Sequence, residues 1–344
     1  MRKPLALLLL TCGAALAQPA QPQPKQSFPV ADALAAAPAV TIANGKITAR
    51  VTTPDPARGF YRGTRFDQAG VVTSLKLGNR EFYGPWFDRT APDVLDYTYT
   101  DDGLVAGPDS AVSGPVEEFA PLGFAPAPGL FVKIGVGVLR QPDSAPYDHY
   151  RHYEIADAGT RETRTTANSV TFIQTLNGAG YSYVYAKTLR LVPGMARLAI
   201  EHRLKNTGMA AIATTVYDHN FLRLVPGGGA VTVRFPFALT PATAPPAGLA
   251  RVAGNTLTYP RPLAGRERLS LPLTGYGPSA SDYDFTVTDP ATGAAVRVRG
   301  DRPLIRINTF AIAQTQAVEP MIAVNVAPGA ELRWTYTYDY TAGR

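Results

Sequence analysis

Two side chains in this 344-residue sequence have the chemistry and the setting of an acid–base pair. The run 212–221 alternates in the manner of a β-strand, so Tyr217 and His219 share one face of it. A histidine flanked by aromatic residues at a strand end is where a binding face would place a proton donor or acceptor. Glu319 is the second candidate, because it follows a polar segment and precedes Pro320, which restricts its backbone. The alternative for Glu319 is an exposed acid in a loop.

The other patterns that could carry chemistry are weaker. His149 and His152 are three residues apart, a spacing that places them on opposite faces of a strand and disfavours a shared metal. His202 shares its predicted strand face with leucine and isoleucine, which favours a core histidine. The sequence contains no phosphate-binding loop, dinucleotide fingerprint, Gly-x-Ser-x-Gly elbow or His-Glu-x-x-His motif.

Residues 1–17 have the features of a cleaved secretory signal peptide: two basic residues, a short apolar run and a small-x-small cleavage site. Cys12, the only cysteine, lies inside this segment, so the mature chain is expected to have neither a disulfide nor a thiolate. Lipid attachment at Cys12 is the alternative, although Thr11 is a poor residue to precede a lipidated cysteine. The sequence therefore predicts a periplasmic or secreted protein. No later stretch approaches the about 20 apolar residues of a membrane-spanning helix, so no stable membrane insertion is expected.

The composition predicts a turn-rich β-protein. Apolar residues make up 45% of the chain, with 31 glycines and 31 prolines, and no long amphipathic helical period appears. The formal charge is +6 at pH 7, but the arginines are scattered among acids and do not cluster with aromatics, so nothing supports nucleic-acid binding. The excess positive charge suits attraction to anionic substrates or envelope surfaces.

The strands are predicted to form one domain. Residues 18–39 are rich in Gln, Pro and Ala and are expected to be a disordered or extended spacer. From residue 40 to 344, short β-rich runs follow one another, with an Asn44-Gly45 hairpin turn near the start. Three of these runs, within 180–222, are expected to form an antiparallel meander. The fold class is therefore all-β, a large antiparallel β-sandwich.

Two segments have the composition of sugar-binding surfaces. The stretch 59–87 is dense in aromatics, arginine and glycine, which together offer flat apolar rings and charged donors. Its alternative interpretation is core aromatics with surface arginines. The second segment, in the loop-like region 90–130, places the adjacent acids Glu117 and Glu118 beside Phe119.

These motifs resemble those of the galactose mutarotase-like superfamily. The sequence Val-Tyr-Asp-His219-Asn-Phe, preceded by the hairpin 183–206, is similar to the element that carries the catalytic histidine in that superfamily. Val318-Glu319-Pro320 is similar to the glutamate segment of the hexose-phosphate epimerase branch, and the closing 327–338 segment looks like the Pro-Gly hairpin that ends aldose 1-epimerases. The family's first histidine has no clean counterpart in this sequence.

The resemblance implies an exported aldose 1-epimerase-like protein that interconverts sugar anomers without a metal or an organic cofactor. Glu319 would be the base and His219 the acid. A carbohydrate, either a monosaccharide or a glycan end, would be the partner. The residues expected to contact it are Arg65, Asp67, Glu118 and Asn220 at hydroxyl groups and Trp86 by stacking.

Two other functions stay open. One is a non-catalytic periplasmic carbohydrate-binding sandwich, and the other, ranked last, is a polysaccharide lyase or hydrolase. Convergence of His219 and Glu319 in one pocket would favour the epimerase, and their separation would favour the binding module. If the two groups are close, the carboxylate is expected to raise the pKa of the histidine and the imidazole to lower that of the glutamate.

Overall fold

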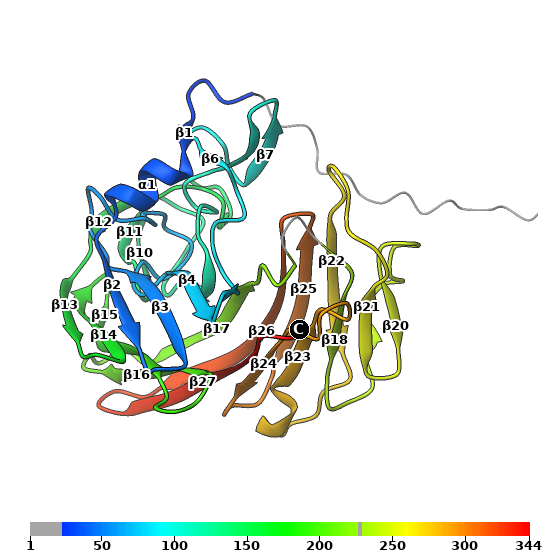
Figure 1. The fold of residues 1–344 in the computed structure, drawn as a ribbon. Coiled ribbons are helices and arrows are strands. Elements are labelled where there is room, and N and C mark those ends of the chain that lie inside the picture. The colour runs from blue at the N-terminus through cyan, green and yellow to red at the C-terminus, as the bar shows by residue number, and fades with distance from the viewer. Residues whose placement is uncertain (1–22, 226–228) are drawn as a thin grey trace, which may run out of the picture.

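Closely spaced glycine and proline turns divide the chain into short alternating segments, and these segments form sheets. The computed structural model describes residues 23–225 and 229–344, which contain five sheets (Figure 1). Apart from one short parallel pair, β6 (Arg89–Thr90) with β8 (Gly103–Ala106), the strand pairs in this part of the chain are antiparallel. The all-β sandwich predicted from the sequence is confirmed.

The largest sheet has ten strands and curves along the lower side of the molecule in Figure 1, from β13 on the left to β20 on the right. Its first four strands follow one another in sequence, and the rest come from the C-terminal half. In spatial order the strands are β13 (Thr160–Thr165), β14 (Ser169–Gly178), β15 (Tyr181–Leu191), β16 (Arg197–Asn206), β27 (Glu331–Thr341), β24 (Ala295–Gly300), β23 (Asp284–Thr288), β18 (Val231–Arg234), β21 (Thr256–Tyr259) and β20 (Arg251–Ala253).

A six-stranded sheet carries the residues singled out by the sequence. Its strand β17 lies between β26 and β9, which fixes it on both sides. In spatial order the strands are β19 (Thr240–Pro241), β22 (Leu269–Thr274), β25 (Arg306–Ile312), β26 (Thr315–Val326), β17 (Ile212–Phe221) and β9 (Gly114–Phe119). Aromatic side chains join this sheet to the larger one, since the Phe119 ring lies 5.5 Å from that of Tyr185 and 6.2 Å from that of Trp334.

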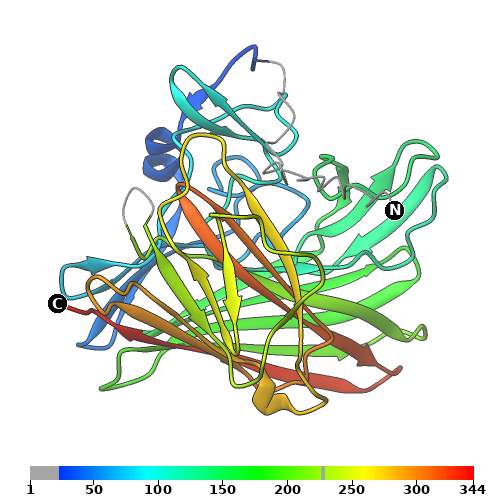
Figure 2. The ribbon, with the colours of Figure 1, turned by 90° about the vertical axis from the view of Figure 1, so that its right-hand side faces the viewer.

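The meander predicted within 180–222 is wrong in its third strand. β15 pairs with β16 as expected, but β17 pairs with β26 in the six-stranded sheet. The buried side chain of Asn206 explains the crossing, because its amide donates to the carbonyl of Ala210 at 2.8 Å and to that of Val326 at 2.9 Å. The Pro328-Gly329 turn lies beside Asn206 and makes a second connection of this kind. It joins β26, in the six-stranded sheet, to β27, in the ten-stranded sheet. Figure 2 shows the long strands of the two sheets running past each other.

Three smaller sheets are formed by the N-terminal part of the chain, residues 28–157. The Asn44-Gly45 turn is confirmed: Gly45 has a φ of 82°, and Asn44 Oδ1 accepts hydrogen bonds from the backbone N–H groups of Lys46 and Ile47. A 3-10 turn, η1 (Ala280–Asp282), precedes β23. The strands are β2 (Ala39–Ala43), β3 (Ile47–Thr52), β4 (Val72–Leu77) and β5 (Arg80–Glu81) in one sheet, β10 (Gly129–Lys133), β11 (Gly137–Gln141) and β12 (Glu154–Asp157) in the second, and β1 (Phe28–Pro29), β6, β8 and β7 (Tyr97–Thr100) in the third.

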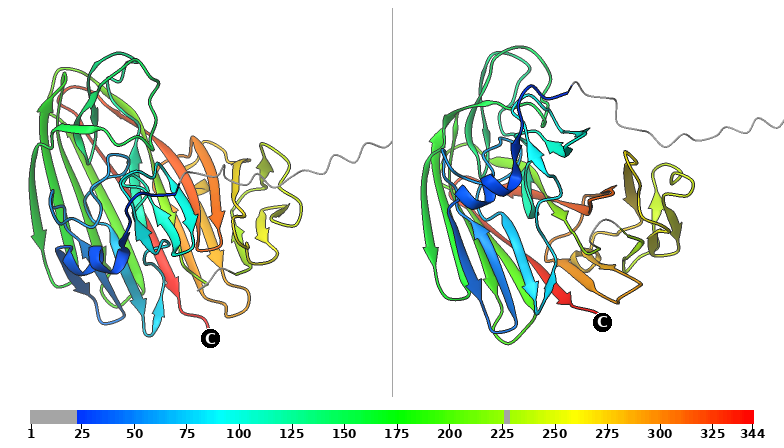
Figure 3. Two further views of the ribbon diagram at one scale, coloured as in Figure 1. Left: turned by 90° about the horizontal axis from the view of Figure 1, so that it is seen from above. Right: turned by 45° about the horizontal axis from the view of Figure 1, so that its top comes forward.

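The predicted signal peptide, residues 1–17, lies outside the described residues, as do residues 18–22 of the predicted spacer. The rest of that spacer is not disordered: it contains β1 and the helix α1 (Val30–Ala36). The helix packs beside β3, where the guanidinium of Arg50 donates to the carbonyls of Leu34 at 2.9 Å and Ala37 at 3.3 Å. Both views in Figure 3 show it next to the blue and cyan strands. No helix among the described residues is long and apolar enough to cross a membrane.

Candidate active site

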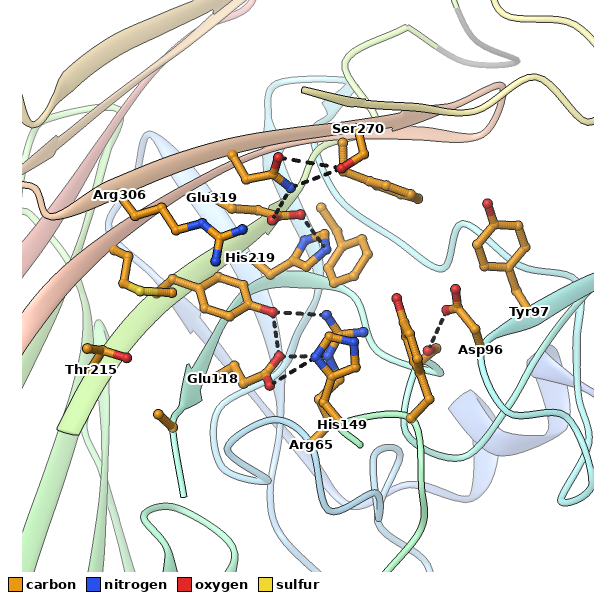
Figure 4. Close-up of a pocket in the computed structure, with 18 of the residues that line it drawn as sticks. Arg65, Asp96, Tyr97, Glu118, His149, Thr215, His219, Ser270, Arg306 and Glu319 are labelled. Carbon is orange, nitrogen blue, oxygen red and sulfur yellow. Dashed lines mark hydrogen bonds and ion pairs between the residues drawn. The ribbon is translucent and has the colours of Figure 1, made fainter. Parts of the chain in front are cut away.

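A cavity of about 400 Å³ lies on the six-stranded sheet, and His219 and Glu319 both line it. Strand pairing brings them together, because β17 and β26 are in register up to Tyr217 and Met321, two residues away from each. His219 Nε2 lies 3.1 Å from Glu319 Oε1, with both side chains mostly buried (Figure 4). The side-chain amide of Asn308, on β25, donates to the other carboxylate oxygen, Glu319 Oε2, at 2.8 Å.

Aromatic rings fix the imidazole of His219. It stacks on Phe221 at 3.7 Å between ring centroids and 6° between planes, as expected for side chains two apart on one strand face. The ring of Phe66 approaches it edge-on at 5.8 Å. These contacts leave Nε2 directed at Glu319, so the orientation of the imidazole is set before any ligand arrives.

Burial determines how this pair holds protons. It lowers the pKa of His219 well below its usual value, with the charges of Arg65 and His149 acting in the same direction. Burial also raises the pKa of Glu319. The shifts expected from proximity alone are therefore wrong in direction, because desolvation of both charged forms outweighs their mutual attraction. Both shifts favour the uncharged forms, a neutral imidazole and a protonated carboxyl group.

A second group of charges lies across the cavity, around Glu118 of β9. Arg65 Nε contacts Glu118 Oε2 at 2.7 Å and Arg65 Nη2 donates to the hydroxyl of Tyr217 at 2.9 Å, while that hydroxyl donates to Glu118. Lys133 Nζ lies 3.6 Å from Glu118 Oε1. Burial alone would raise the pKa of Glu118, but the charges of Arg65, Lys133 and His149 hold it at about 2. Glu118 is therefore an anion throughout the physiological range.

His149 is a cavity residue that the sequence did not single out for this site. It comes from the loop between β11 and β12, and its Nδ1 lies 3.6 Å from Glu118 Oε1. Burial and the charge of Arg65 lower its pKa to about 4, so it is neutral near pH 7. His152 turns the other way, and its Nδ1 lies 3.1 Å from Asp109 Oδ2. Across 23–225 and 229–344, no three His, Cys, Asp or Glu side chains gather as metal ligands would.

Trp86 lines the cavity as part of its wall. Its ring lies parallel to that of Phe221, 5.6 Å between centroids, and its Nε1 donates to the carbonyl of Val112 at 3.0 Å. Only 3% of the residue is exposed. Trp86 therefore supports the rings that hold His219, and the stacking role predicted for it lacks an exposed ring face.

Solved structures match this architecture, although no protein-family model and no curated protein matches the sequence. A protein of Synechocystis superposes with a TM-score of 0.52 at 13% identity, over 88% of this chain and 96% of its own. A putative aldose 1-epimerase of Escherichia coli gives 0.51 at 12% identity, over 88% and 99%. A galactose mutarotase related enzyme of Lactobacillus acidophilus gives 0.51 at 14% identity, over 89% and 98%. The chain has a galactose mutarotase-like fold.

Within the galactose mutarotase-like fold, two residues predicted to contact sugar point away from this cavity. The buried amide of Asn220 donates to the carbonyls of Asp218 at 3.0 Å and Val318 at 2.9 Å, so it serves the strands themselves. Asp67 borders a separate cavity of about 120 Å³ and pairs with Lys187 Nζ at 2.9 Å. Arg65, Trp86 and Glu118, by contrast, line the same cavity as the His219–Glu319 pair.

Two further arginines line the cavity, and no sequence motif marked them. Arg268 lies 3.8 Å from Asp96 Oδ2, with its guanidinium over the ring of Phe310 at 5.4 Å. Arg306 begins β25 two residues before Asn308, so both side chains lie on the face of the strand that carries the cavity. In the sequence, only this alternation could have indicated that Arg306 faces the cavity. It could be used only once the boundaries of the strand were known.

Proposed function

We propose that this protein is an exported aldose 1-epimerase-like enzyme that interconverts the anomers of a sugar. The observation that carries the proposal is the 3.1 Å contact between His219 and Glu319 in a cavity large enough for a sugar ring. A mutual approach of an acid and a base in one pocket favours an enzyme over a binding module. The putative aldose 1-epimerase of Escherichia coli, which shares the fold, adds support by analogy.

The reaction needs one proton to leave and one to arrive. Glu319 takes the proton of the C1 hydroxyl while His219 gives a proton to the ring oxygen, so the bond between C1 and the ring oxygen breaks and an open-chain aldehyde forms. Rotation about the C1–C2 bond turns the carbonyl, and the ring closes on the other face as the two protons return. No electron is transferred, and the pair regains its original protonation.

The reaction uses the form of the pair that has the proton on His219 and an ionised Glu319. Burial opposes charge on both groups, so it favours the neutral form, with the proton on Glu319, over this reactive form. Activity requires the pair to hold one proton. The rate is expected to fall in acid, where His219 is also protonated, and in alkali, where that proton is lost.

Anomer exchange measured by NMR on freshly dissolved α-aldoses tests the proposal. His219→Ala and Glu319→Gln are each expected to lower the catalysed rate by about 10²–10⁴-fold, the range typical of general acid–base groups. Glu331→Gln, a change of the same type at a solvent-exposed strand end, is the control and should leave the rate unchanged. Wild-type exchange rates in folded His219→Ala and Glu319→Gln proteins would refute the assignment.

Export is part of the same proposal. It is supported by the sequence features of residues 1–17, and it places the enzyme in the periplasm or outside the cell. N-terminal sequencing of protein recovered from the periplasm tests it, with cleavage after residue 17 as the expected result. Retention of an uncleaved chain in the cytoplasm would contradict it.

A further inference from the structure

Two of the three arginines that line the cavity face a carboxylate. Arg65 is paired with Glu118 at 2.7 Å, and Arg268 lies near Asp96 at 3.8 Å. Arg306 is exposed and makes no hydrogen bond or ion pair with any residue between 23 and 225 or 229 and 344. Figure 4 shows its guanidinium directed into the cavity, on the side of Glu319.

Glu319 is not available as a partner for Arg306. One oxygen of its carboxyl group contacts His219 at 3.1 Å, and the other accepts a hydrogen bond from Asn308 at 2.8 Å. Burial raises the pKa of Glu319, and the charge of Arg306 acts against this rise without forming an ion pair. The cavity therefore presents one unneutralised guanidinium close to the acid–base pair.

Arg306 stands one strand repeat from the residue that contacts Glu319. Asn308, which contacts Glu319, lies two residues along β25 from Arg306, and that repeat is about 6.8 Å in an antiparallel strand. In a pyranose, C5 is bonded to the ring oxygen, so a carboxylate on C5 lies next to the atoms that react. The guanidinium, close to the acid–base pair, is thus placed for a substituent at this end of the ring.

We propose that this site takes uronic acids, with the anomeric carbon at His219 and Glu319 and the sugar carboxylate on Arg306. The inference rests on the function proposed above and names its substrate class. A planar guanidinium matches a carboxylate through two parallel hydrogen bonds, and one positive charge balances one negative charge. A phosphate dianion would need a second free cation, and Arg65 and Arg268 already face the carboxylates Glu118 and Asp96.

Matched sugars test the inference directly. Glucuronate and glucose differ only at C6, as do galacturonate and galactose, so each pair isolates the carboxylate. We expect calorimetric affinity and kcat/KM to favour the uronate by about tenfold or more, and the preference to shrink as ionic strength rises. Arg306→Gln should remove the preference, because it lowers affinity and kcat/KM for the uronate by about tenfold more than for the matched neutral sugar.

A control variant that loses the same charge elsewhere separates direct contact between Arg306 and the uronate from attraction by the overall positive charge of the protein. Arg251→Gln removes an exposed arginine on β20, outside this cavity, and should keep the uronate preference intact. Equal affinity for uronate and neutral sugar, or tighter binding of glucose 6-phosphate than of glucuronate, would overturn the inference. So would an Arg306→Gln effect of equal size on both sugars.

The two readouts distinguish this inference from the proposed function. If uronates bind through Arg306 but no sugar shows catalysed anomer exchange, the proposed enzyme activity fails and the substrate class stands. If neutral sugars are turned over as efficiently as uronates, the activity stands and the substrate class fails.

Discussion

Glu117 and Glu118 are neighbours on β9 and face opposite sides of it. Glu117 points into the interior, where Lys187 Nζ contacts one oxygen at 2.6 Å and His202 Nε2 the other at 2.8 Å. Glu118 points into the cavity, where it meets Arg65 and, at a longer distance, the partly exposed His149. In both cases nearby positive charges overcome the effect of burial and lower the carboxyl pKa to about 2. The two carboxyl groups therefore have similar pKa values but different roles.

The difference lies in what surrounds each ion pair. The interior group continues through Asp67, which holds Lys187 from the other side, and through Trp334, whose ring lies parallel to that of His202 at 4.7 Å. These groups are at least 97% buried, and Asp67 and Lys187 border only the separate cavity of about 120 Å³. The Glu118 group opens onto a cavity of about 400 Å³. Buried charge thus supports the fold on one face of β9 and a candidate binding site on the other.

The largest expected effect on stability comes from the interior side of this comparison. Glu117→Gln would leave Lys187 and His202 without their shared carboxylate, and loss of one partner of a buried ion pair costs about 3–5 kcal/mol. Urea unfolding of the purified variant measures this change. Glu331→Gln, at an exposed site, is the control. A loss below about 1 kcal/mol would mean that the interior charges contribute little to folding.

The pH dependence of stability sharpens the contrast further. Burial and the charge of Glu117 raise the pKa of Asp218 to about 8, so the folded protein holds a proton that the unfolded chain releases near pH 4. The contribution of Asp218 to stability should consequently fall as the pH rises between about 4 and 8, while His149 and His219, whose pKa values are lowered, act in the opposite direction. Asp218→Asn imitates the protonated acid and is expected to flatten this decline in urea unfolding measured at pH 5, 6, 7 and 8. An unchanged slope would assign the effect to another group.

The smallest effect on stability is expected at the cavity side. Glu118→Gln leaves Arg65 and Lys133 without a carboxylate, but burial already lowers the pKa of Lys133 to about 8, so it can release its proton. We expect a loss of about 1–3 kcal/mol in urea unfolding. Sugar affinity, measured by calorimetry, should fall by about tenfold or more, because Glu118 fixes Arg65 in the cavity wall. A stability loss as large as that of Glu117→Gln, with affinity intact, would contradict the comparison.

Local alternation predicted the parts of the site that lie on regular strands. Tyr217 and His219 share the cavity face of β17 as expected, and the Asn44-Gly45 turn forms where the sequence places it. Arg65 and Asp67 show where alternation fails. Two residues apart, they would share a face on a strand, but the segment between 59 and 70 is irregular, so one lines the cavity and the other faces Lys187.

Long-range placement could not be read from the sequence. The destination of β17 depends on β9 and β26, which lie about a hundred residues away on either side. His149 reaches the cavity from a loop, where no period marks a direction. The directions of the pKa shifts at His219 and Glu319 depend on burial, which only the packed structure reveals.

The placement of the aromatic rings has an optical consequence. The chain has two tryptophans, and each stands beside one of the two regions compared here. Trp86 stacks on Phe221, which in turn stacks on the His219 imidazole at the cavity, whereas Trp334 stacks on His202 in the interior. Replacing either indole with phenylalanine leaves a single tryptophan beside the 17 tyrosines. With excitation selective for tryptophan, the two single-tryptophan variants can therefore report cavity occupancy and interior unfolding separately, without an added label.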